Sequence, residues 1–207
     1  MNNKTKKYIL KRNKLDCEYL TINQLDCFGY IPFVIVGIVD LNEFNKLIKI
    51  NCENNKISNI INICDNVEYI NCKSNLIIKF SYLPDNLKIF LCDYNKIIEL
   101  NNLPTGLKFL SCDSNELVRL DNLPFGLEYL SCGVNPIENL DYLPYGLTKL
   151  YLQGKMDKLK SLGDIPNSIE EIMSGSTLVI GFIKQNFPKD FILANSQLEL
   201  WKKIKNN

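Results

Sequence analysis

The sequence predicts a solenoid of stacked repeats, each with one short parallel strand, and three observations support this fold class. Apolar, cysteine and asparagine residues recur with a step of 20 along most of the 207-residue chain. Within each repeat, apolar residues alternate with polar ones, which indicates a short strand with one buried face. A Leu-Pro dipeptide returns with the same step, and its proline suits an extended segment that leads back to the next strand.

The repeat is defined by columns of equivalent positions, which we expect to stack on one another. The aliphatic column that opens each unit comprises Leu47, Val67, Leu87, Leu107, Leu127 and Leu147. The next apolar column comprises Ile50, Ile70, Phe90, Leu110, Leu130 and Leu150. One unit of this size cannot bury its own apolar face, so the fold depends on contacts between neighbouring units.

The order of residues in one unit, Leu87-x-x-Phe90-x-Cys92-x-x-Asn95-x-Ile97, resembles the leucine-rich-repeat signature, with cysteine at the third apolar position. The resemblance covers about residues 41 to 172. The short period is most similar to the repeats of bacterial effectors, although those carry a doubled Leu-Pro where this chain has one. Asn-rich and Cys-rich repeat proteins of large amoeba-infecting DNA viruses are similar too. The resemblance implies a horseshoe-shaped solenoid with a parallel β-sheet on its concave face, a mostly extended or irregular convex side and little helix outside the caps.

The repeat boundaries divide the chain into three parts. We expect residues 1–40 to form an N-terminal cap or a degenerate repeat, because they do not keep the step of 20. Residues 41–174 form the predicted repeat array, in which the segment 143–164 is two residues longer than the other units. Residues 175–207 are predicted to be a C-terminal cap, partly helical from Ser196, which is a candidate helix N-cap.

We assign structural roles to two columns, one of asparagines and one of cysteines. The asparagine column comprises Asn55, Asn75, Asn95, Asn115 and Asn135. Each of its amides can donate and accept at once, so we expect it to bond to backbone groups of its own and of the neighbouring unit. The cysteine column comprises Cys52, Cys72, Cys92, Cys112 and Cys132. We expect these cysteines to be buried, reduced and without metal, because no C-x-x-C spacing is present and a reducing compartment keeps thiols free.

Composition excludes several classes of function. With 24 basic and 23 acidic residues, the chain offers no strong field for nucleic acid. The absence of histidine removes the commonest general base and metal ligand, and we expect no cofactor and no small-molecule substrate. The longest apolar stretch, residues 31–39, is far shorter than the roughly 20 residues that a membrane span needs. We therefore expect a cytoplasmic protein (in the host cytoplasm if viral) that does not interact with membranes and is not secreted through a signal peptide.

Alternation along the predicted strands leaves one column of large side chains on the outer face of the sheet. Its centre comprises Tyr69, Ile89, Phe109 and Tyr129, and Tyr151 is exposed in the next unit. The predicted polar border comprises Lys73, Asp93 and Asp113. Aromatic groups gathered on one face favour protein binding, because contiguous exposed apolar patches tend to mark interaction sites. The alternative is that loops or caps cover these side chains.

These observations predict a non-enzymatic scaffold that binds a protein partner on its concave face. Asp93 and Asp113 could in principle work as paired carboxylates, but no phosphate-binding loop and no nucleophile beside a base accompanies them. One alternative, suggested by the effector resemblance, is a substrate-recognition subunit of a ubiquitin-ligase-type complex, whose catalytic part would be another chain. The other alternative is a structural virion component.

Overall fold

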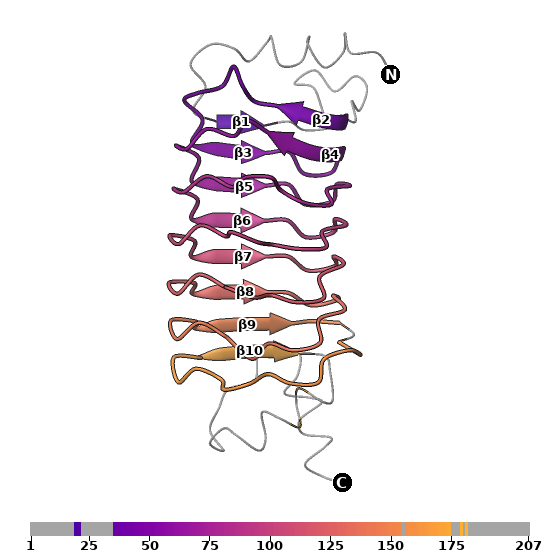
Figure 1. Ribbon diagram of the computed structural model, residues 1–207, viewed down its shortest axis with the longest axis vertical. Coiled ribbons are helices and arrows are strands. Elements are labelled where there is room, and N and C mark those ends of the chain that lie inside the picture. Colours follow the sequence, from indigo (N-terminus) through magenta and orange to yellow (C-terminus); the bar gives the residue numbers. More distant parts are fainter. Residues whose placement is uncertain (1–18, 22–34, 155, 175–178, 180, 182–207) are drawn as a thin grey trace.

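The structure is a computed structural model that describes residues 19–21, 35–154, 156–174, 179 and 181. The chain winds into a solenoid with an eight-stranded parallel sheet along one side (Figure 1). In their order across the sheet, the strands are β1 (Tyr19–Thr21), β3 (Lys49–Asn51), β5 (Tyr69–Asn71), β6 (Ile89–Leu91), β7 (Phe109–Ser111), β8 (Tyr129–Ser131), β9 (Lys149–Leu152) and β10 (Glu171–Ser174). This arrangement confirms the predicted parallel-strand solenoid.

The strand register follows the step of 20 in the middle of the array and departs from it at both ends. Phe90 of β6 lies beside Leu110 of β7, 20 residues later. At the C-terminal end Leu150 lies beside Ile172, which places the predicted two-residue insertion in this turn. Between β1 and β3 the step is longer, because Leu20 lies beside Ile50.

A second, two-stranded parallel sheet lies on the return side of the first turns. It joins β2 (Val36–Asp40) to β4 (Lys56–Ile61), with a register shift between Gly37 and Ile38. Both strands run opposite to the strands of the large sheet, because they carry the chain back (Figure 1). Residues 36–40 therefore continue the return side of the solenoid. The proposed division of the chain at residue 40 stays a prediction.

Residues 35–154 and 156–174 contain strands, turns and extended segments but no helix. The return segments end in a turn that the Leu-Pro dipeptide opens. Leu87 N donates to Pro84 O at 3.0 Å, and Leu107 N donates to Pro104 O at 3.1 Å. The helix predicted from Ser196, together with Cys17 and Cys27, lies outside the described residues.

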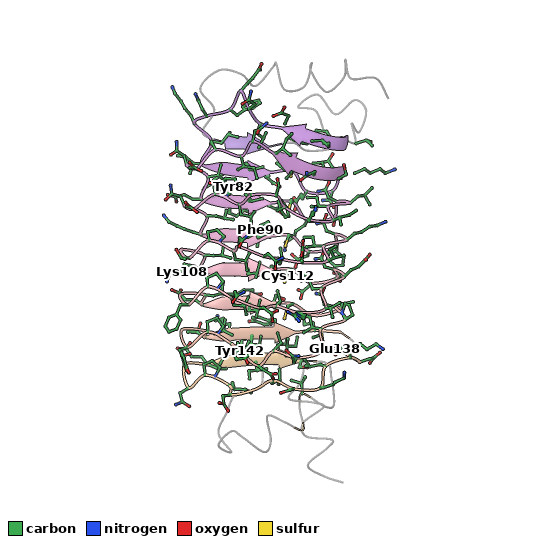
Figure 2. All side chains as sticks on the ribbon, in the orientation of Figure 1. Tyr82, Phe90, Lys108, Cys112, Glu138 and Tyr142 are labelled. Atoms are coloured by element: carbon green, nitrogen blue, oxygen red, sulfur yellow. The ribbon has the colours of Figure 1, made fainter. Side chains whose placement is uncertain are left out.

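The hydrophobic core is one continuous stack between the large sheet and the return segments. Its columns are those that the sequence defines, and side chains such as Phe90, Leu107 and Leu110 have no exposed surface. Phe90 also contacts Phe80 of the return segment edge to face, with ring centroids 5.1 Å apart. Figure 2 shows Phe90 and Cys112 near the middle of the stack, whereas Lys108 and Glu138 lie at its two edges.

The asparagine column forms a continuous hydrogen-bonded ladder inside the solenoid. Asn95 Nδ2 donates to Cys92 O of its own turn at 3.1 Å and to Cys72 O of the preceding turn at 3.0 Å. Its Oδ1 accepts from Ile77 N of the preceding turn at 3.0 Å. The same set of bonds recurs at Asn75, Asn115 and Asn135. Each amide thus supplies partners for backbone groups that would otherwise be buried and unpaired.

The cysteine column fills the interior directly beneath the strands. Its five side chains are buried, and the cysteines of the described residues form no disulfide. Burial in an apolar environment raises the pKa of Cys52 to about 12, with a further contribution from Glu53. Burial also raises the pKa values of Cys72 and Cys112 well above the ordinary range. The thiolate is therefore strongly disfavoured at every turn.

We expect the five thiols of the cysteine column to be labelled only when the solenoid unfolds. An alkylating reagent needs an accessible thiolate, and these groups offer neither exposure nor ionisation. Mass spectrometry of the labelled protein, with and without denaturant, would assign each label to its residue. Half-buried Cys64 provides an internal comparison, since it is the most accessible of the described cysteines. Rapid labelling of four or more of the five in native buffer would contradict the packing described here.

Candidate protein-binding face

The sheet face, defined as the side of the eight-stranded sheet that points away from the core, carries a row of large side chains. This row, the aromatic stripe, comprises Tyr69, Ile89, Phe109 and Tyr129, which occupy the first position of four adjacent strands. Ile89 is exposed, and the three aromatic residues are half-buried. Exposed Lys49 and Lys149 continue the row beyond its two ends.

The centre of the aromatic stripe is a stacked pair. The rings of Phe109 and Tyr129 are nearly parallel, at 7°, and their centroids lie 3.7 Å apart. Tyr151 extends this cluster from β9, with its centroid 5.0 Å from that of Tyr129. Because the pair spans two adjacent strands, its position is fixed by the register of the sheet. The structure therefore brings the sequence-predicted residues Phe109, Tyr129 and Tyr151 together into one surface.

A polar row runs along the sheet face beyond the ends of the strands. Lys73 Nζ lies 2.7 Å from Asp93 Oδ2, and Ser111 Oγ donates to Asp93 Oδ1 at 2.6 Å. Asp113 N also donates to Asp93 Oδ1, at 2.8 Å. Burial alone would lower the pKa of Lys73, but the hydrogen bond that its ammonium group donates to Asp93 and the charges of Asp93 and Asp113 raise it overall.

The expectation that Asp93 lies on an exposed polar border is wrong, because only 2% of its surface is exposed. Asn71, Ser111 and Ser131, which alternation along the strands would also place on the outer face, are buried as well. Each of them is hydrogen-bonded to a carboxylate of the preceding turn, which is Glu53, Asp93 or Asp113 respectively. Beyond β6 the chain turns, and the small side chain of Ser111 leaves room for Asp93 to fold over the neighbouring strand.

Asp113 repeats this arrangement one turn later but lacks a basic partner. Ser131 Oγ donates to Asp113 Oδ2 at 2.5 Å, and Gly133 N donates to Oδ1 at 2.5 Å. Burial raises the pKa of Asp113, and the nearby charge of Asp93 adds to this effect, while the two hydrogen bonds oppose it. No ion pair to Asp113 occurs within the part of the chain that the structure describes.

A second group of exposed aromatic residues lies on the edge where the chain enters the strands. Phe125 is 75% exposed and Tyr145 is 76% exposed, and their ring centroids lie 5.9 Å apart. Tyr142, which precedes Leu143-Pro144 and is labelled in Figure 2, is 80% exposed as well. Sequence reasoning missed this group because it considered only strand positions. The signal was the residue after each Leu-Pro, which changes from Asp85 and Thr105 to an aromatic in the last units.

The described residues offer little basis for catalysis. They contain no group of three acidic or cysteine side chains that could hold a metal ion. The buried thiols are held protonated, so none of them can act as an exposed nucleophile. Among the described residues, no helix is long and apolar enough to cross a membrane.

Solved structures of leucine-rich-repeat effectors are similar to this chain in fold. The chain is similar to YopM from Yersinia enterocolitica (27% identity, TM-score 0.58), covering 63% of this chain and 29% of that one. It is also similar to YopM from Yersinia pestis, a leucine-rich effector protein (28% identity, TM-score 0.59), covering 64% and 38% of the two chains. The leucine-rich-repeat domain of a Shigella effector shares the fold at 19% identity (TM-score 0.56, covering 90% and 83%).

The sequence itself matches no protein-family model and no curated protein. The chain spans less than two-fifths of either Yersinia protein that it matches. What the structural likeness establishes is the leucine-rich-repeat fold, whose solenoids are typically non-catalytic scaffolds for protein interaction.

Proposed function

Because the chain has the leucine-rich-repeat fold, we propose that it is a non-enzymatic scaffold that binds a protein partner on its sheet face. The observation that carries this proposal is the aromatic stripe, and in particular the stacked Phe109–Tyr129 pair at its centre. Large aromatic side chains held on a rigid sheet lose little conformational entropy on binding, which makes them effective anchors.

The surroundings of the stripe also favour protein binding over other ligands. Its flanks carry charges of both signs, with Lys88 paired to Glu68 at 3.0 Å and Lys108 paired to Glu128 at 2.8 Å. A mixed polar rim around an apolar centre is the usual anatomy of a protein–protein interface. Nucleic acid would require a positively charged surface, which these paired charges do not provide.

We expect the double substitution Phe109→Ser and Tyr129→Ser to abolish capture of the partner. Each central aromatic anchor contributes about 2 kcal/mol or more to binding. The loss of folding stability should be smaller, about 1–2 kcal/mol, because the pair contributes mainly its stacking across two strands. The measurement is affinity capture from a lysate of the native cells on the immobilised full chain, with thermal unfolding recorded in parallel.

The matched control is Phe125→Ser with Tyr145→Ser, which removes the same residue types from adjacent turns at the loop edge. We expect this control to capture the same proteins as the wild type. If the control loses the partner and the stripe variant keeps it, the binding surface is the loop edge and the proposal is wrong. An unfolded stripe variant would also count against it, because Phe109 and Tyr129 would then be required for the core.

A further inference from the structure

Within the part of the chain that the structure describes, Asp93 and Asp113 are two neighbouring carboxylates of the polar row, and one ammonium group, that of Lys73, acts on both. Lys73 forms an ion pair with Asp93, with Nζ 2.7 Å from Oδ2, and Asp93 is almost completely buried. Among the described residues, the donors to Asp113, one turn further along, are neutral: the hydroxyl of Ser131 and the amide of Gly133. Asp113 therefore has no ion-pair partner among the described residues, although the charge of Lys73 acts on it, and its side chain remains partly exposed.

The Asp113 carboxylate lies beside the centre of the aromatic stripe. Ser131, whose hydroxyl donates to Asp113, lies on β8 two residues after Tyr129. Burial raises the pKa of Tyr129, and the nearby charge of Asp113 raises it further. Asp113 and the stacked Phe109–Tyr129 pair are therefore neighbours on the sheet face, linked through β7 and β8.

We propose that the partner presents a lysine or arginine side chain to Asp113 and places neighbouring apolar side chains on the Phe109–Tyr129 pair. This inference rests on the proposed function and specifies the chemistry of the partner. Charge complementarity favours such a partner. Keeping an anion half-buried without a cation is unfavourable, and a basic side chain of the partner would remove that penalty while gaining a charge-assisted hydrogen bond.

A metal ion is a poorer occupant of this position. Calcium takes six to eight oxygen ligands and magnesium demands octahedral geometry, usually with more than one acidic ligand. Asp93 cannot serve as the second carboxylate, because Lys73, Ser111 and the Asp113 amide already occupy its oxygens. A basic side chain needs only the one carboxylate that is available.

The test is selection of a displayed library of random peptides on the immobilised full chain, and the key variant is Asp113→Asn. Asparagine is nearly the same size and can still accept the hydrogen bond from Gly133 N, so the variant should fold at least as stably as the wild type. Asp85→Asn is the control for net charge, because Asp85 is exposed on the loop edge. The Phe109→Ser, Tyr129→Ser variant reports whether the selected peptides bind the stripe at all.

We expect the wild type and Asp85→Asn to select peptides with an arginine or lysine next to apolar residues. Changing that basic residue to glutamine should weaken binding to the wild type by about tenfold or more, and binding to Asp113→Asn by less than about twofold. Peptides that need the stripe but bind Asp113→Asn as tightly as the wild type would overturn this inference and leave the proposed function standing. Peptides indifferent to the stripe variant, or no selected peptides, would contradict both.

Discussion

Phe90→Ala is expected to lower the free energy of unfolding by about 3–5 kcal/mol, the largest effect of any single substitution considered for this chain. Phe90 has no exposed surface and lies on β6, with stacked turns on both sides. The substitution also removes the edge-to-face contact between Phe90 and Phe80. Neighbouring turns are held by the same sheet, so they cannot collapse into the cavity that the missing ring would leave.

Two controls separate this cavity effect from other causes. Phe125→Ala removes the same side chain from an exposed loop and should change stability by less than about 0.5 kcal/mol. Phe90→Leu should cost much less than Phe90→Ala, because leucine fills the equivalent position at Leu110, Leu130 and Leu150. Denaturant midpoints measure all three. A Phe90→Ala midpoint equal to that of the wild type would contradict the assigned packing.

Asn115→Ala is expected to cost about 3 kcal/mol, because an unpaired buried backbone group costs about 1–3 kcal/mol and this substitution leaves more than one. Asn115 Nδ2 donates to Cys92 O and Cys112 O, each at 3.0 Å. Its Oδ1 accepts from Ile97 N at 3.0 Å. Urea unfolding provides the measurement, with exposed Asn101→Ala as the control that should stay within about 0.5 kcal/mol of the wild type.

Asn115→Asp sharpens the same test through its dependence on pH. Aspartate keeps the acceptor for Ile97 N but would bring a negative charge to the carbonyl oxygens of Cys92 and Cys112. Those oxygens would raise the pKa of the introduced carboxyl in the folded state above its value of about 4 in the unfolded chain. Stability should therefore fall as the pH rises from about 4. If Asn115→Asp lost the same free energy of unfolding relative to the wild type at pH 4 and at pH 7, the side chain at this position would face solvent instead.

The interior of the solenoid could be predicted residue by residue from the sequence. In a stack with a fixed period, positions 20 apart share one environment, so the burial of Cys112 and Leu107 follows from the column that each occupies. The contacts of Asn115 follow in the same way, because an amide repeated at every turn meets the same backbone groups each time. Periodicity allows burial and contacts to be predicted because the same residue type recurs at the same position of several units.

Features that belong to single units could not be predicted in the same way. The burial of Asp93 depends on the serine at position 111, and the only sequence signal is that Asp93 and Asp113 are each followed by a serine 18 residues later. The strand β2 could not be predicted because the longer step between β1 and β3 interrupts the 20-residue period. The exposed pair of Phe125 and Tyr145 lies in a column whose residue type varies, so its only sequence signal is the aromatic residue after Leu-Pro in two units.

The asparagine ladder also gives the solenoid a direction for its assembly during synthesis. Asn95 satisfies Cys72 O and Ile77 N of the turn before it, so each turn is completed by the asparagine of the next one. A chain that leaves the ribosome N-terminus first can therefore close one turn after every 20 residues, without waiting for distant sequence. Assembly through these bonds does not depend on the final number of turns. Insertion or loss of a whole 20-residue unit would leave the asparagine hydrogen bonds the same at every remaining junction.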